Sequence, residues 1–305
     1  MTEHPRQIRS FSRVGGRLTS AQGAAWHEYG HLVVAPTLGM FSQIDPGFRL
    51  ESVFDGDLPL VERSGEVLGG DVPPVERSGS VLGGDVPPVE RSREAVESKP
   101  RRCGVGNPVI VEVGSGDGAQ AIAYATAHPE VNVVAVEVYR EGIAEGLRTG
   151  AELSNLRFVR ADAAALLAHV ADVRSETRTG SGIPAQVRGG AGIAAGGGPV
   201  SESSPGGLSE VWTYFPDPWR KARHAKRRIV SDAFAQSVAR ALTPGGVWRL
   251  ATDWGDYAAH MTAVLERSPL RVVPADRAER IVTKYERKAI AAGRRIHEFQ
   301  AVNDA

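Results

Sequence analysis

Carboxylates flank a glycine-rich turn in the segment 109–141, and this combination can do chemistry. The segment predicts an apolar strand, a turn over Gly114 and Gly116, a helix and a second apolar strand. Glu112 lies two residues before the first glycine, and Glu137 closes the second strand. Glycines let the backbone turn sharply and let a ligand approach closely. A carboxylate at the end of the second strand can receive ribose hydroxyls. The pattern indicates half of a site for a nucleotide cofactor.

Two cofactors compete for this half-site. Gly114, Gly116 and Ala119 satisfy the dinucleotide pattern G-x-G-x-x-[GA], which holds a pyrophosphate at a helix N-terminus. However, Glu112 and Asp117 would both repel a pyrophosphate. A sulfonium cation with an amino-acid tail tolerates them far better. We therefore favour S-adenosylmethionine over NAD. An NAD-dependent oxidoreductase is a distant alternative, because no hydride-transfer arrangement of His, Lys or Tyr accompanies the glycines.

Composition limits the compartment and the partners. The formal net charge of the 305 residues is zero, so the whole chain does not predict a polyanionic partner, although cations cluster locally. Cys103 is the single cysteine, which excludes an internal disulfide and fits a reducing compartment. No apolar run reaches membrane-spanning length, and the charged start of the chain carries no signal-peptide core. We expect a cytoplasmic protein with no membrane partner.

The chain divides by composition. Residues 1–50 form a basic arm, and residues 51–107 predict a disordered linker that contains 14-residue tandem repeats. Each repeat is too poor in aliphatic side chains to offset its ordering entropy. Residues 108–305 predict one catalytic domain, interrupted at about 172–208 by a Gly/Ser-rich insertion without fixed structure.

Strands and helices alternate through the domain. This alternation predicts an α/β fold with a doubly wound, mostly parallel sheet covered on both faces. The predicted strands are 109–113, a second strand that ends at 137, 156–160, 210–214, 246–251 and 270–273, and the helices after the second to the fifth strands are 139–153, 163–170, 228–242 and 254–266. Ligands of such sheets lie beyond the carboxyl ends of the strands. Acidic side chains fall at or near those ends: Glu112, Glu137, Asp162, Asp217 and Asp253.

A proline-rich turn, Phe215–Trp219, follows the fourth strand. Its two prolines fix φ on either side of Asp217, so the turn predicts a rigid shelf. Asp217 could accept hydrogen bonds from a planar nitrogenous base on which Trp219 stacks. The alternative is a simple turn whose tryptophan belongs to the core. Six cations lie within residues 220–228, and such clusters supply phosphate contacts to nucleic acids. The substrate base is therefore expected to belong to a polynucleotide.

These segments together resemble the bacterial tRNA (guanine-N7-)-methyltransferases. The resemblance rests on IRSFSRVGGRLTSAQ, VEVGSGDG, AVEVYREGI, FVRADA, TYFPDPWRKARHAKRRIV, ATDWGDYAAHM and TKYERKAIAAGRR, in this order. It implies the Rossmann-like, seven-stranded class I fold that uses S-adenosylmethionine. It also implies methyl transfer to N7 of the guanine at position 46 of tRNA, in the variable loop.

The resemblance further implies roles for named residues. Those expected to bind S-adenosylmethionine are Glu112, Gly114, Gly116, Glu137, Asp162 and Asp217, and Asp217 is also the expected catalytic acid. Those expected to contact the substrate nucleotide are Lys221, Asp253, Thr283, Lys284, Tyr285 and Glu286. Many members continue after the last of these with R-G-x-x-x-G-H, whereas this chain ends the stretch with Gly293-Arg294.

The sequence alone leaves three questions open. The enzyme could methylate another RNA or a small heterocycle, or the chain could be a catalytically silent RNA-binding protein of the same fold. It could be a monomer or a homodimer. His27-Glu28-Tyr29-Gly30-His31 matches the zinc motif H-E-x-x-H. However, Gly30 interrupts the helix that this motif needs and no third ligand stands out, so no metal is expected.

Overall fold

The computed structural model describes residues 17–38, 41–54, 106–179, 207–277 and 279–305. Three predictions therefore fall outside the described residues: the start of the basic arm, the tandem repeats, and most of the Gly/Ser-rich insertion. Within the described ranges, no helix combines the length and apolar character that crossing a bilayer requires.

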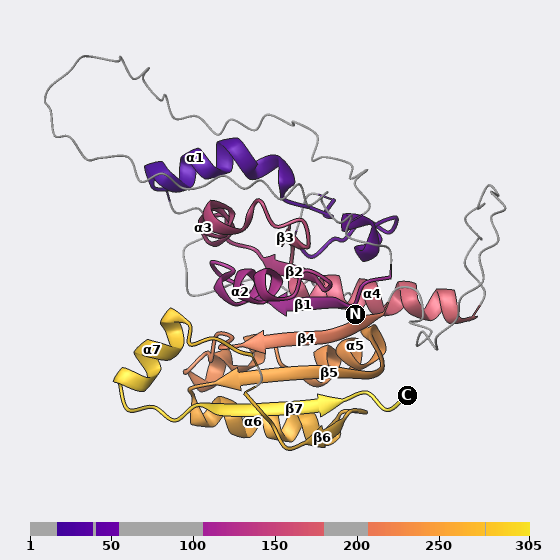
Figure 1. Cartoon of the computed structure of the whole chain (residues 1–305). Helices are drawn as coiled ribbons and strands as arrows, with labels where there is room; N and C mark the ends of the chain where they lie inside the picture. Colours follow the sequence, from indigo (N-terminus) through magenta and orange to yellow (C-terminus); the bar gives the residue numbers. More distant parts are fainter. Residues whose placement is uncertain (1–16, 39–40, 55–105, 180–206, 278) are drawn as a thin grey trace, which may run out of the picture.

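A seven-stranded sheet forms the centre of the molecule, with strand order β3-β2-β1-β4-β5-β7-β6 (Figure 1). The strands are β1 (Val109–Val113), β2 (Asn132–Glu137), β3 (Leu156–Arg160), β4 (Leu208–Tyr214), β5 (Leu242–Thr252), β6 (Arg271–Val273) and β7 (His297–Val302). Strands β1 to β5 run parallel to one another, and β7 runs antiparallel to both β5 and β6. The predicted doubly wound, mostly parallel sheet is confirmed.

Helices cover the two faces of this sheet, and the period-two alternation of strand side chains decides what each face packs against. In β1, Val109, Val111 and Val113 join the core under one helical layer, whereas Ile110 joins the core under the other. The first layer is α4 (Ala163–Thr179), α5 (Asp232–Ala241) and α6 (Gly255–Arg267). The second is α1 (Ser20–Tyr29), α2 (Ala119–Ala127) and α3 (Arg140–Gly150). Glu112 is thereby directed toward α2.

The structure differs from the sequence-based elements in three places. Helix α4 continues to Thr179, so the predicted insertion begins later than 172. The segment 270–273 is not the final strand, because β7 follows it and inserts between β5 and β6. Helix α7 (Lys284–Ala291) was not predicted, although Thr283 caps it through its side chain. In Figure 1, α7 lies beyond the edge at which β4 and β5 end.

Part of the predicted arm packs on the domain. Helix α1 lies against α3, and Gln22 Nε2 of α1 donates to Glu145 Oε2 at 3.3 Å. Arg140 of α3 lies 4.6 Å from the centroid of the Trp26 ring. Helix α1 ends at Tyr29, within the H-E-x-x-H match, and a 3₁₀ turn (Gly30–Leu32) follows. The two histidines of the match therefore do not share one continuous α-helix.

Candidate active site

The glycine-rich loop between β1 and α2 forms one wall of the site. Gly114 and Gly116 have φ values of 68° and 59°, a region that side-chain-bearing residues rarely adopt. A Cβ on either glycine would point into open space, so a ligand can approach the backbone there. Helix α3 supports the loop from behind, because a Cβ on Gly142 would lie only 2.5 Å from the carbonyl oxygen of Gly116. The Ser115 hydroxyl is buried and finds no hydrogen-bond partner within the described ranges.

Glu112 and Glu137 are both buried beside this loop, and main-chain amides hold them. Ala121 N donates to Glu112 Oε2 at 3.1 Å. Gly116 N donates to Glu137 Oε2 at 2.9 Å, and Val138 N and Tyr139 N donate to Oε1 at 2.7 and 3.0 Å. Thus the turn and the helix start fix the direction of both carboxylates.

Burial raises the pKa values of these two carboxylates, and this favours a positively charged ligand beside them. Desolvation, with help from the nearby charges of Asp117 and Glu137 and against the hydrogen bond from Ala121 N, raises the pKa of Glu112 to about 8. Desolvation likewise raises the pKa of Glu137, with a smaller contribution from the charge of Asp217. A positively charged ligand would relieve this repulsion and favour the ionised forms. The open glycine backbone, the unpartnered Ser115 hydroxyl and two desolvated carboxylates fit S-adenosylmethionine better than a pyrophosphate.

Asp162 lies at the same edge but has a local structural role as well. It follows β3, whose Arg160 pairs in register with Glu137 of β2. Its Oδ1 accepts from Ala164 N at 2.8 Å, so it caps the start of α4. Nothing in the described contacts links the Asp162 carboxylate to Glu112 or Asp217, and its predicted contact with the cofactor stays a prediction.

Asp217 lies exposed on the turn after β4. Two residues with positive φ bracket the turn, Phe215 at 49° and Trp219 at 46°. Such conformations cost energy and persist where the surroundings enforce them. One restraint is a hydrogen bond from Phe215 N to the carbonyl of Ala251 at 2.8 Å. Another is Arg228, whose Nε donates to the carbonyl of Pro218 at 2.9 Å. The charge of Asp217 contributes to the raised pKa of Glu137, so this turn lies near the wall formed by the glycine-rich loop with Glu112 and Glu137, which we name the cofactor wall.

The expected stacking of a base on Trp219 is wrong for this conformation. Only 6 % of Trp219 is exposed, and the Arg227 guanidinium lies 4.9 Å from the centroid of its ring. His224 meets the same ring edge-on at 5.7 Å. The tryptophan anchors the turn as part of the core, which is the alternative that the sequence left open.

The basic segment after the turn forms a short 3₁₀ helix, η3 (Ala222–Arg227). Lys221 and Arg223 are exposed, as a phosphate contact requires. Arg228 is not part of this surface, because it is 6 % exposed and pairs with Asp256. The cluster therefore divides into an exposed cationic face and one buried arginine that supports the Asp217 turn.

Residues 283–286 approach the cofactor loop from the far end of the chain. Thr283 caps α7, Tyr285 is 56 % exposed, and Lys284 Nζ lies 2.7 Å from Asp117 Oδ2 in the glycine-rich loop. Two further contacts join the preceding residues to α2 and its end. Ile281 N donates to Gln120 Oε1 at 2.8 Å, and His128 Nε2 lies 2.6 Å from Glu279 Oε2. We name residues 279–284 the clasp, since they run along α2 and bring the substrate motif to the cofactor wall.

Glu286 is enclosed rather than presented to a substrate. Its side chain is 1 % exposed and lies 2.7 Å from Arg277 Nη1 and 2.6 Å from Arg280 Nη1. Arg280 also pairs with Glu298 of β7 and lies over the rings of Tyr214 and Phe215. A direct contact between Glu286 and a nucleotide does not fit this burial. In the structure Glu286 ties α7 to the segment before it and, through Arg280, to the start of the Asp217 turn.

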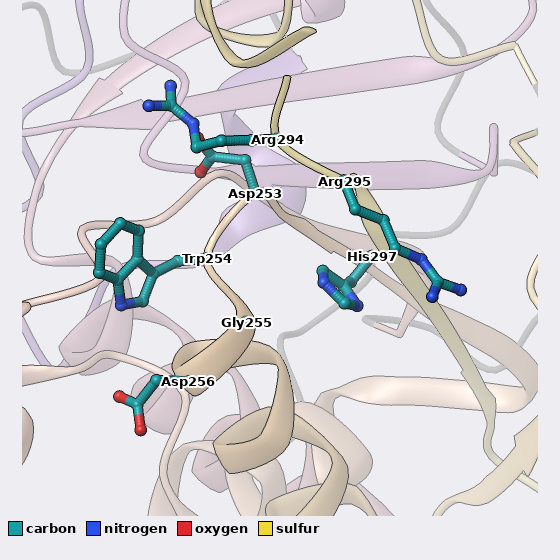
Figure 2. A pocket seen from close by; sticks show the side chains of 7 residues that line it. All are labelled: Asp253, Trp254, Gly255, Asp256, Arg294, Arg295 and His297. Carbon is teal, nitrogen blue, oxygen red and sulfur yellow. The ribbon is translucent and has the colours of Figure 1, made fainter. Parts of the chain in front are cut away.

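Asp253 lies just past β5 and lines a cavity of about 330 Å³ (Figure 2). Its Oδ2 lies 2.7 Å from Nε of Arg294, which comes from the turn before β7.

Sequence reasoning assigned no role to Arg277, Arg280 or Arg294. Their spacing along the chain carries no helical or strand pattern, so only the fold brings them to the site.

Comparisons with known proteins identify similar sequences and similar structures. The family model described as "Putative methyltransferase" matches residues 106–176 and 201–299. A tRNA (guanine-N(7)-)-methyltransferase of a Nocardioides species is 35 % identical over 96 % of this chain and 86 % of its own length. One from Cutibacterium acnes is 40 % identical over 63 % of this chain and 62 % of its own length. Among solved structures, the 16S rRNA methyltransferase KamB matches 65 % of this chain and 88 % of that chain, with 16 % identity and a TM-score of 0.41. The similarity in sequence shows that this chain belongs to the tRNA (guanine-N(7)-)-methyltransferase family.

Proposed function

We propose that this protein transfers a methyl group from S-adenosylmethionine to N7 of a guanine in tRNA, and that this guanine is position 46 in the variable loop. The observation that carries the proposal is the arrangement around Asp217. This exposed carboxylate lies close enough to the buried Glu137 for its charge to raise the pKa of that residue, and the exposed cations Lys221 and Arg223 follow it in the chain. The names of the relatives supply the substrate class.

Glu112 and Glu137 would hold the cofactor together with the backbone of Gly114 and Gly116. S-adenosylmethionine supplies an electrophilic methyl group on a positively charged sulfur. Asp162 would contribute from the neighbouring strand end. The main-chain bonds that fix Glu112 and Glu137 mean that the pocket is organised before the cofactor arrives.

The reaction requires the protein mainly to align the two reactants and to stabilise the charge that develops on the purine. N7 of guanine has an in-plane lone pair and no proton at neutral pH, so no general base is needed to create the nucleophile. Alignment of reactants can contribute several kcal/mol. Methylation moves positive charge onto the purine, and Asp217 would stabilise that charge as it develops. Because the positive-φ turn is already held by its hydrogen bonds, it would not have to reorganise during the reaction.

The exposed cations would bind the tRNA backbone. Lys221 and Arg223 are exposed and follow Asp217 closely in the chain, so they would be available for phosphate contacts. Because N7 faces the deep groove or tertiary contacts in folded RNA, the base must be exposed before it can reach Asp217. Lys284 and Tyr285 would then meet the nucleotide from the clasp side of the site.

The direct test is methylation of an unmodified tRNA transcript with labelled S-adenosylmethionine, followed by mapping of the modified nucleoside. We expect one 7-methylguanosine, at position 46. A transcript with 7-deazaguanine at that position is the matched control, because it lacks the nucleophilic nitrogen and should accept no label. Label on a different nucleoside, or equal label on the deaza transcript, would refute the proposal.

A further inference from the structure

The cavity beside Asp253 brings together two distant parts of the chain. One wall is the turn from β5 into α6, with Asp253, Trp254, Gly255 and Asp256. The other is the entry into β7, with Arg294, Arg295 and His297. Register pairing between Thr252 of β5 and His297 of β7 holds the two walls next to each other. A Cβ on Gly255 would meet no atom within 4 Å, so the space above the turn is open.

The charges in this cavity do not cancel evenly. Both of its carboxylates have cationic partners, since Asp253 pairs with Arg294 and Asp256 pairs with Arg228. Arg295 is exposed and forms no ion pair with any residue that the structure describes. In Figure 2 its guanidinium lies on the His297 side of Gly255, away from the Asp253–Arg294 pair. The cavity therefore keeps one uncommitted strong cation, and it favours an anion.

The opposite side of the cavity offers an aromatic surface. Trp254 is half-buried, and Figure 2 shows its indole across Gly255 from His297. The Arg220 guanidinium lies 4.5 Å from the centroid of the indole, so the first residue after the Asp217 turn reaches the rim of the same cavity. This stacking joins the cavity to the exposed cationic face. An anion bound here would thus lie on a surface continuous with that face.

We propose that this cavity binds a backbone phosphate of the RNA next to the nucleotide that is methylated, with Arg295 as its main contact. The proposal rests on the proposed function, because the class of ligand is a polynucleotide. Arg294 acts as a positioning residue: it neutralises Asp253, which would otherwise repel the phosphate. Guanidinium groups present fork-shaped donors that match a phosphate, and Arg295 is free to use them.

The test compares Arg295→Ala with the wild type in tRNA binding at several salt concentrations. Arg271→Ala is the matched control, because it also removes one exposed cation but at a site far from the cavity. Arg271 lies in β6 in register with Val302, at the other end of β7, and its side chain forms an ion pair with Asp304. We expect Arg295→Ala to raise the Kd and the KM for tRNA about fivefold and to reduce the slope of log Kd against log salt by about 0.7–0.9. The Kd for S-adenosylmethionine and the kcat at saturating tRNA should not change, and Arg295→Lys should restore most of the slope.

The outcomes separate the two proposals. If the wild type forms 7-methylguanosine in tRNA and Arg295→Ala leaves the slope and the KM unchanged, the phosphate site is wrong and the proposed function stands. If the wild type forms none, the proposed function fails by itself. Arg294→Ala adds a second measure, since it exposes the charge of Asp253 and should weaken tRNA binding more than Arg295→Ala does. An effect of Arg294→Ala no larger than that of Arg271→Ala would overturn its positioning role.

Discussion

The cofactor wall and the substrate side of this site are built in opposite ways. The cofactor wall comes from one continuous stretch, 109–141, and main-chain amides hold its carboxylates. The substrate side comes from separate segments at 217–228, 253–256 and 279–297, and side-chain ion pairs join them. The carboxylates of the cofactor wall are buried, whereas the substrate side presents exposed cations such as Lys221 and Arg223 together with buried ion pairs. The pocket for a small cation is therefore organised locally, whereas the surface for a polyanion depends on the complete fold.

This difference predicts different consequences for substitutions. A change in the cofactor wall should alter ligand affinity and proton binding with little effect on distant elements. A change in a buried ion pair of the substrate side should also loosen the segments that the pair connects, because a charge left alone in the interior is costly. Substitution of an exposed cation should not loosen the fold, because water already solvates that charge.

The largest expected effect is on turnover, at the residue where the two sides meet. Asp217→Asn keeps the size of the side chain and removes its charge, so we expect kcat to fall by about 10²–10³-fold. The Kd for S-adenosylmethionine, measured by calorimetry, should change only a few-fold. Glu137→Gln is the paired control from the cofactor wall, and it should mainly weaken cofactor binding. A wild-type kcat for Asp217→Asn would remove its catalytic role.

The next largest effect is on stability, at Glu286. Replacing it with Ala removes the carboxylate that Arg280 and Arg277 share. Loss of one member of a buried pair costs about 3–5 kcal/mol, and because both arginines keep Glu298 we expect a loss near the lower end of this range. The free energy of unfolding in urea measures this. Lys288→Ala on the exposed face of the same helix should stay within about 0.5 kcal/mol of the wild type. If Glu286→Ala is as stable as the wild type but loses tRNA affinity, then Glu286 contacts the substrate directly, as its sequence motif suggests.

The sequence predicts the cofactor wall far better than it predicts the substrate side. Gly114, Gly116, Glu112 and Glu137 could be placed because strand alternation and turn chemistry act over a few residues. The clasp could not be predicted, because the contacts of Lys284 with Asp117 and of Glu279 with His128 span more than 150 residues and follow no period. The interior position of Glu286 was missed for the same reason. Helix α7 did leave a local signal, the T-x-x-E capping pattern at Thr283.

A smaller effect, on the pH dependence of stability, tests the desolvation of the cofactor wall. The folded-state pKa of Glu112 is about 8, above its ordinary value of 4.5, so the folded protein holds an extra proton between these values. The free energy of unfolding should therefore fall as pH rises toward 8, by up to about 1.4 kcal/mol per pH unit from this group. In Glu112→Gln that contribution is absent, so the variant should gain stability relative to the wild type between pH 6 and 8.5. Parallel curves for the two proteins would show that Glu112 is already ionised in the folded state.

The smallest expected effect is on the salt dependence of tRNA binding, at the exposed cations Lys221 and Arg223. It shows whether these cations bind RNA independently of the buried ion pairs of the substrate side. Lys221→Ala with Arg223→Ala removes two solvated charges, so the urea midpoint should not move. Each lost phosphate contact should reduce the slope of log Kd for tRNA against log salt by about 0.7–0.9. The matched control is Arg240→Ala with Arg267→Ala, which removes two exposed arginines from the last turns of α5 and α6, at the opposite edge of the sheet. Equal changes in slope for the two double variants would mean that net charge alone steers the RNA. A slope change confined to Lys221 and Arg223 would mean that this face binds the backbone, because distant charges would then contribute attraction but no released counterions.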